Sequence, residues 1–137
     1  MLHAICSGQE VTSACPKGAG SEMWGFIPPF VATNLPQIVN KDYDKKDTKG
    51  GTNPIFGVDG SPIVHDAFIK GFKIAGDQIE PDDVKRWRTI LFVPYGRGGA
   101  GFSVLDVTDP VPSSSTGPIH MFSIFNDQVN NLSLIHI

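Results

Sequence analysis

The sequence predicts an all-β fold, and three observations support this. Short runs of apolar, β-branched and aromatic residues recur along the chain, each bounded by turn residues. Glycine and proline are abundant, with 15 and 11 residues respectively, as many tight turns require. Helix-forming stretches are nearly absent, because prolines limit segment 30–39 to about one helical turn. Roughly six or seven short antiparallel strands indicate a sandwich or part of a β-propeller.

A predicted hairpin organises the middle of the chain. Residues 89–93 and 102–107 are runs of strand length, and the glycine-rich piece 96–101 lies between them. We expect these glycines to form a tight loop with positive φ angles. A phosphate-binding loop is not favoured, because such a loop opens a helix and a strand follows here. Asp109 and Pro110 then end the second strand in a turn.

Two further strands are predicted near the start of the chain, at 2–5 and 22–27. Cys6 and Cys15 lie in the polar loop between them, on the limbs of one hairpin, where a disulfide is well placed. Free thiols are the main alternative. A zinc site would need two more ligands, which the sequence does not supply at ligand spacing. We expect Trp24 to pack against a neighbouring strand.

Segment 40–53 is polar and carries a weak hint of a calcium site. Asp42, Asp44 and Asp47 could offer carboxylate oxygens from a short turn. However, the interspersed lysines neutralise the cluster, and the glutamate that closes an EF-hand loop is missing. A solvated surface loop is therefore the favoured interpretation, and we assign no metal ligand.

The remaining segments are expected to alternate between turns and strands. A turn at 59–62 leads into a strand that reaches residue 69, and 70–86 is expected to be a connecting loop. After Pro110 comes a turn-rich loop, and 119–125 reads as one more strand. The strands at 22–27 and 119–125 show loose similarity, as expected of consecutive propeller blades.

Composition and motifs exclude several functions. The net charge of −3 and the pI near 5.7 leave no basic surface for nucleic acid. No apolar run approaches the ~20 residues of a membrane span. His65 and Asp66 are adjacent, so in a strand they point to opposite faces and cannot form a dyad. No nucleophile-elbow motif exists either, so we predict no catalytic residues and no cofactor site.

Five blocks of the chain, taken in order, resemble the C-terminal β-propeller domain of the PilY/PilC family of type IV pilus assembly and tip-adhesin proteins. The blocks span nearly the whole chain as far as about residue 131; they are 1–5, 20–29, 58–66, 87–91 and 98–110. Within the blocks we single out the structural motif positions Trp24, Asp59, Gly60, Trp87, Gly98, Gly99, Gly101, Asp106, Asp109 and Pro110. The possible disulfide pair, Cys6 and Cys15, lies between the first two blocks, in a loop that departs from the family pattern.

The resemblance implies a partial, quinoprotein-like propeller of roughly two to three blades, here residues 1–131. We expect 132–137 to be a sequencing scar, because it is the one-frame translation of a common transposon-adapter sequence; a genuine strand is the alternative. A propeller fragment would expose apolar faces and strand edges, and is therefore expected to aggregate or stay partly molten alone.

The resemblance also implies a function. Members are exported to the periplasm or outer membrane, the pilus tip or the cell surface, and act without enzymatic activity in pilus extension, twitching motility and adhesion. Pilin subunits, minor pilins and a host or abiotic surface are the implied partners. Calcium binds some members, at a loop that no segment here reproduces. The alternatives are a quinoprotein-like oxidoreductase and a generic secreted β-propeller binding module.

Overall fold

The computed structural model describes residues 1–8, 11–12, 15, 17–33, 35–38, 57–113, 116–127 and 132–136. The elements within these ranges are β1 (Leu2–Ile5), β2 (Glu22–Phe26), α1 (Pro29–Ala32), α2 (Leu35–Ile38), β3 (Ile63–Ala75), β4 (Gln78–Pro94), η1 (Gly96–Gly98), β5 (Gly101–Asp106), β6 (Ile119–Asp127) and β7 (Leu132–His136). The all-β prediction is confirmed, and the partial propeller stays a prediction. The calcium hint at Asp42, Asp44 and Asp47 lies outside the described residues.

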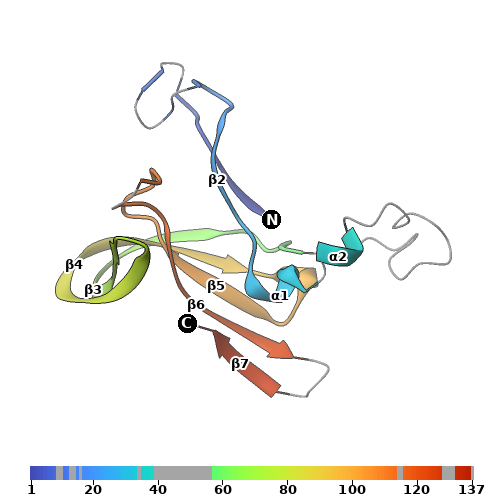
Figure 1. Ribbon diagram of the computed structural model, residues 1–137. Helices are drawn as coiled ribbons and strands as arrows, with labels where there is room; N and C mark the ends of the chain where they lie inside the picture. Colours follow the sequence, from blue (N-terminus) through green and yellow to red (C-terminus); the bar gives the residue numbers. More distant parts are fainter. Residues whose placement is uncertain are drawn as a thin grey trace.

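The strands form two antiparallel sheets. β1 and β2 make a two-stranded ribbon, and β3 to β7 follow one another in chain order in a five-stranded sheet. The ribbon rises from one face of the larger sheet and runs across its strands (Figure 1). Successive side chains of a strand point to opposite faces of its sheet, so each of the two sheets directs every second side chain toward the other.

The core lies between the ribbon and the larger sheet. Leu91, Val93 and Leu105 are buried in it, and Trp24 and Phe26 of β2 pack against them. Burying an aliphatic side chain of this size contributes roughly 1.5–3 kcal/mol. The ribbon is therefore held to the sheet by apolar packing rather than by strand pairing.

The opposite face of the larger sheet carries a row of aromatic rings. The ring centroids of Phe92 and Phe102 are 4.5 Å apart, and those of Phe102 and Phe122 are 6.2 Å apart. These spacings suit tilted and edge-to-face aromatic pairs. The sheet thus has an apolar layer on each side.

The predicted central hairpin is confirmed. β4 pairs with β5 in a register that sets Ile90 opposite Asp106 and Pro94 opposite Phe102. Gly96 has φ +57°, as the tight loop requires. A Cβ on Gly98 would overlap the backbone oxygen of Gly57, so close backbone approach excludes any side chain there.

The prediction of a connecting loop at 70–86 is wrong, because this segment completes one long hairpin of β3 and β4. The strands pair as far as Ala75 and Gln78, and the two residues between them form the turn. Opposite charges face each other across the two strands and stabilise their pairing: Lys70 Nζ lies 2.9 Å from Asp83 Oδ1. The sequence predicted a loop because the segment is rich in charged residues, and a high charge in one segment alone is typical of a loop.

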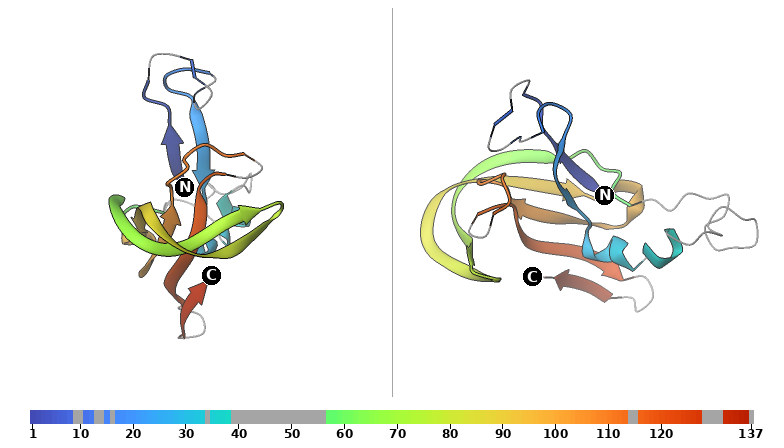
Figure 2. Two further views of the ribbon diagram at one scale, coloured as in Figure 1. Left: turned by 90° about the vertical axis from the view of Figure 1, so that its left-hand side faces the viewer. Right: turned by 45° about the horizontal axis from the view of Figure 1, so that its top comes forward.

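Beyond its pairing with β5, the β3–β4 hairpin leaves the sheet. We call residues 66–88 the arm. The arm curls around toward the aromatic face, away from the ribbon (Figure 2). A bulge between Ile69 and Gly71 interrupts the pairing within it, and bulges increase local bending and twist.

The last strand, β7, pairs with β6 and sets Ser123 opposite His136. A paired strand here matches the alternative of a genuine strand. The adapter origin of 132–137 concerns the DNA, so it stays a prediction, as does the boundary at residue 131.

Candidate binding sites

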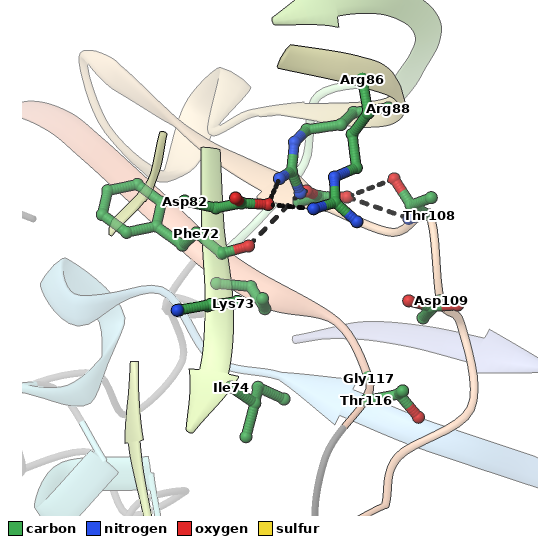
Figure 3. Close-up of a pocket in the computed structure, with 12 residues that line it drawn as sticks. Phe72, Lys73, Ile74, Asp82, Arg86, Arg88, Thr108, Asp109, Thr116 and Gly117 are labelled. Atoms are coloured by element: carbon green, nitrogen blue, oxygen red, sulfur yellow. Dashed lines mark hydrogen bonds and ion pairs between the residues drawn. The ribbon is translucent and has the colours of Figure 1, made fainter. Parts of the chain in front are cut away.

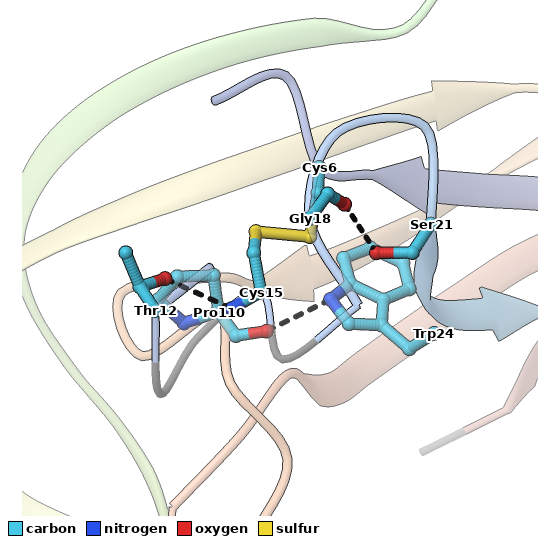
Figure 4. Close-up of a disulfide and its surroundings, with 7 residues drawn as sticks. All are labelled: Cys6, Thr12, Cys15, Gly18, Ser21, Trp24 and Pro110. Atoms are coloured by element: carbon cyan, nitrogen blue, oxygen red, sulfur yellow. Dashed lines mark hydrogen bonds between the residues drawn. A yellow bond between two sulfur atoms is a disulfide. The ribbon is translucent and has the colours of Figure 1, made fainter. Parts of the chain in front are cut away.

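Cys6 and Cys15 form a disulfide in the structure, with a Cα–Cα distance of 5.8 Å. Figure 4 shows that the bridge closes the loop between β1 and β2, close to Trp24 and Pro110. The Trp24 Nε1–H donates a hydrogen bond to the carbonyl oxygen of Pro110, at 2.9 Å. This bond ties the ribbon to the turn after β5. Two of the predicted motif positions, 86 residues apart in sequence, are thereby brought together.

Asp59 and Gly60 lie against the glycine-rich loop. The Asp59 N–H donates to the Tyr95 carbonyl oxygen at 3.1 Å, and a Cβ on Gly60 would lie 2.6 Å from the Pro94 oxygen. Added Cβ atoms on Gly99 and Gly101 would also crowd neighbours, the ring of Phe30 and the backbone of β6. The three glycines therefore allow close approach to the backbones of β4 and β6 and to the Phe30 ring, and the Asp59 contact is made by its backbone.

The structure reveals a buried ion network that the sequence analysis missed. Arg88 is only 5% exposed. Its Nη2 lies 2.6 Å from Asp82 Oδ2, and its Nη1 lies 2.5 Å from Asp106 Oδ2. Nη1 also donates to the Phe72 carbonyl oxygen at 3.3 Å (Figure 3). We call Arg88, Asp82 and Asp106 the arm latch, because they join the curled arm to the end of β5.

Two features stabilise the arm latch. Asp106 Oδ1 accepts hydrogen bonds from both the backbone N–H and the hydroxyl of Thr108. A Cβ on Gly71 would lie 2.7 Å from Arg88 Nε, so glycine lets the arm backbone reach the guanidinium. Arg88 could have been found from strand periodicity, because it shares a face with Ile90 and Phe92, and a charge on an apolar face requires a partner.

Asp82 has a pKa below the ordinary aspartate value. The largest cause is the hydrogen bond that the Val84 N–H donates to Asp82 Oδ1, and the positive charges of Arg86 and Arg88 act in the same direction. Arg86 Nη2 lies 2.8 Å from Asp82 Oδ2, but its side chain is 55% exposed. Asp82 is therefore ionised at neutral pH and available to both arginines.

A polar cavity of about 360 Å³ adjoins the arm latch. It is lined by residues of the arm and of the connection between β5 and β6: Phe72, Lys73, Ile74, Asp82, Arg86, Arg88, Asp106, Thr108, Asp109, Thr116, Gly117 and Ile119. Two predicted motif residues, Asp106 and Asp109, lie here. The sequence singled out these two residues as motif positions, but it did not predict the cavity.

A chain of hydroxyl groups runs through the core on the ribbon side. Ser103 Oγ lies 2.7 Å from both the Tyr95 hydroxyl and Ser123 Oγ, and His120 Nε2 lies 2.8 Å from Ser123 Oγ. A serine beside a histidine is the geometry of an activated nucleophile. However, Ser103, Ser123 and Tyr95 have no exposed surface. The serine hydroxyls cannot meet a substrate, so this pair is structural.

Apolar surface is exposed on the ribbon side of the β3–β4 hairpin. Trp87, a predicted motif position, is 68% exposed, and its ring centroid lies 5.7 Å from that of Phe68, which is 55% exposed. Val64, on the same strand as Phe68, is also exposed. A hollow of about 290 Å³ with apolar walls lies between β1 and this face, lined by Leu2, Ala4 and Leu91 among others.

No three His, Cys, Asp or Glu side chains within the described ranges come together as a set that could hold a metal ion. No described helix is long and apolar enough to cross a membrane.

Comparison with known proteins gives one consistent result. The chain is 35% identical over 91 residues to the type IV pilus biogenesis factor PilY1 of Pseudomonas aeruginosa strains PAO1 and PAK, and 34% identical to that of strain UCBPP-PA14. The match covers 66% of this chain and 6% of each relative. No protein-family model and no solved structure matches. The resemblance to PilY-type pilus proteins is therefore confirmed: 66% of this chain is similar to PilY1, and the chain spans 6% of the length of these relatives.

Proposed function

We propose that this chain acts in type IV pilus biogenesis as a non-enzymatic part of an exported, PilY1-like protein. The observation that carries the proposal is the 35% identity over 91 residues to a protein named as a pilus biogenesis factor. That name describes a role in assembly rather than a chemical reaction. The chain spans 6% of the length of these relatives, so the role is proposed for the protein to which the segment contributes.

We propose further that β3 to β6 form one blade of a partial β-propeller. Four antiparallel strands in chain order are the arrangement of a propeller blade. Blades bury apolar faces against their neighbours, and the exposed Phe68 and Trp87 supply such a face. The ribbon β1–β2 would then belong to the preceding blade.

Pilin or minor pilin subunits and a host or abiotic surface are the proposed partners, in pilus extension, twitching motility and adhesion. The Cys6–Cys15 disulfide supports export, because disulfides persist in oxidising compartments such as the periplasm and the cell surface. Calcium is proposed only for the intact protein, by family resemblance, and no ligand to it is assigned here.

Deletion of the gene in its host tests the proposal. We expect fewer surface pili, measured by shearing the cells and quantifying pilin in the sheared fraction, with total cellular pilin unchanged. Plasmid-borne wild-type gene should restore the pili. Unchanged pili together with loss of quinone-dependent dye reduction by the cells would instead establish the oxidoreductase alternative.

A further inference from the structure

The polar cavity beside the arm latch has the size of a small-molecule site. Its volume of about 360 Å³ falls at the lower end of the range for small-molecule pockets. Lys73 and Ile74 of β3 lie on one side, and Asp109 and Thr116 of the β5–β6 connection face them on the other (Figure 3). Segments more than 30 residues apart in sequence thus form its walls.

The arm latch fixes these walls. Arg88 is buried and bonded to Asp82 of the arm and to Asp106 of β5, at 2.6 and 2.5 Å. Moving the arm away would separate these buried charges, which is strongly unfavourable. The cavity is therefore formed before any ligand arrives, and binding does not have to order its walls.

The charges around the cavity balance one another. Arg88 is paired with two carboxylates, Arg86 shares Asp82 with it, and Lys73 Nζ lies 3.7 Å from Glu80 Oε2. An anion or a cation would gain little net attraction and would compete with existing pairs. The cavity therefore favours a neutral ligand.

The polar groups at the open side both donate and accept hydrogen bonds. The exposed Lys73, Arg86 and Thr116 can donate, and the exposed Asp109 can accept. The half-buried Ile74 and the buried Ile119 add an apolar wall. A sugar ring combines hydroxyls that donate and accept with an apolar C–H face. We infer that this cavity binds a neutral saccharide, with its C–H face toward Ile74 and its hydroxyls on Asp109 and Thr116.

NMR titration of the 137-residue chain, prepared with its disulfide intact, tests the inference. The probes are methyl glycosides of glucose, galactose, mannose, N-acetylglucosamine and N-acetylgalactosamine, each added to about 50 mM, with sodium phosphate as the ionic comparison. At least one glycoside should give saturable shifts confined to the amides of the cavity walls. Binding should change little between about 50 and 500 mM salt, because the ligand is uncharged.

Matched variants locate the site. Ile74→Ala should weaken the apparent Kd about tenfold, whereas Phe68→Ala, an exposed apolar side chain on the same strand outside the cavity, should leave it unchanged. Asp109→Asn and Thr116→Val, both at exposed positions that tolerate substitution, should weaken it several-fold.

Other results would overturn the inference. These results are the absence of saturable shifts with every glycoside, equal losses of affinity in Ile74→Ala and Phe68→Ala, or competition by phosphate. An unliganded chain without dispersed resonances would also overturn it, since the preformed cavity would be absent. If a monosaccharide binds, the chain is then passed over beads that carry the same sugar at the end of an oligosaccharide. Retention of the chain indicates a cell-surface glycan as the ligand's source, and no retention indicates the free sugar.

Discussion

Replacing Arg88 by methionine should remove a large part of the stability of the folded chain. The substitution keeps the length of the buried stem but leaves Asp106, with a side chain 4% exposed, without its cation, and leaves Asp82, 8% exposed, with only the exposed Arg86. Removing one partner of a buried ion pair costs about 3–5 kcal/mol. Small domains have only about 5–15 kcal/mol of unfolding free energy in total.

Arg86→Met is the matched control. It removes a guanidinium that bonds to the same carboxylate oxygen, at 2.8 Å, but whose side chain is 55% exposed. Exposed pairs contribute about 0–1 kcal/mol, so the two variants should differ by at least ~2 kcal/mol. The triple variant Arg88→Met, Asp82→Asn, Asp106→Asn should recover part of the loss, because it leaves no uncompensated buried charge.

Urea unfolding of the disulfide-intact chain measures these differences. Far-UV circular dichroism and tryptophan fluorescence should report one transition, with similar m-values in all variants. This single transition departs from the expectation that a propeller fragment stays partly molten alone, because the ribbon and the larger sheet bury a core within this chain. Equal losses of less than about 1 kcal/mol in Arg88→Met and Arg86→Met would refute the reasoning. In that case the arm latch would not be a buried structural unit.

Three further predictions follow from the same structure. Replacing Cys6 and Cys15 by serine should cost about 2–3 kcal/mol in urea unfolding, because a loop of roughly ten residues is no longer closed in the unfolded chain. Ser123→Ala should cost about 1–3 kcal/mol, since it leaves buried hydroxyls without a partner, whereas the exposed Ser113→Ala should cost little. Asp82 has a lowered pKa, so its contribution to the free energy of unfolding is complete above its unfolded value of 3.8 and is lost as pH falls through the lower folded value. Acid titration of stability should show this loss in the wild-type chain and not in Asp82→Asn.

Local patterns in the sequence predicted the central hairpin well. The runs at 89–93 and 102–107 alternate their apolar side chains, and the glycines between them serve a loop in which the backbone of residue 57 approaches Gly98. The strands flanking Cys6 and Cys15 were predicted for the same reason. Such features depend on neighbouring residues, which a sequence presents directly.

The arm was missed because its strands are held by pairs that are distant in sequence. Lys70 meets Asp83 across the hairpin, and Arg88 meets an aspartate from β5. Each residue alone is typical of a loop, and only the pairing makes a strand favourable. A Gly-Asp pair at 76–77 between two alternating runs was the available signal, since it favours a two-residue turn.

The candidate cavity could not be predicted, because it depends on how far the arm curls. Asp106 and Asp109 were singled out as motif positions, but their partners come from the arm, which was expected to be a loop. Trp87 was also singled out from the sequence, but its exposure could not be predicted, because it depends on how much of the face of the larger sheet the ribbon covers.

Segment exchange tests the central claim, PilY1-like function, most directly. The 91 matched residues of this chain would replace the corresponding residues in the PilY1 gene of Pseudomonas aeruginosa strain PAO1, and surface pilin would be quantified after shearing. We predict surface pilin close to the wild-type level for the chimera, and a marked loss when the chimera also carries Arg88→Met, with PilY1 protein levels measured in parallel. A stable chimera that makes no surface pili would contradict the account.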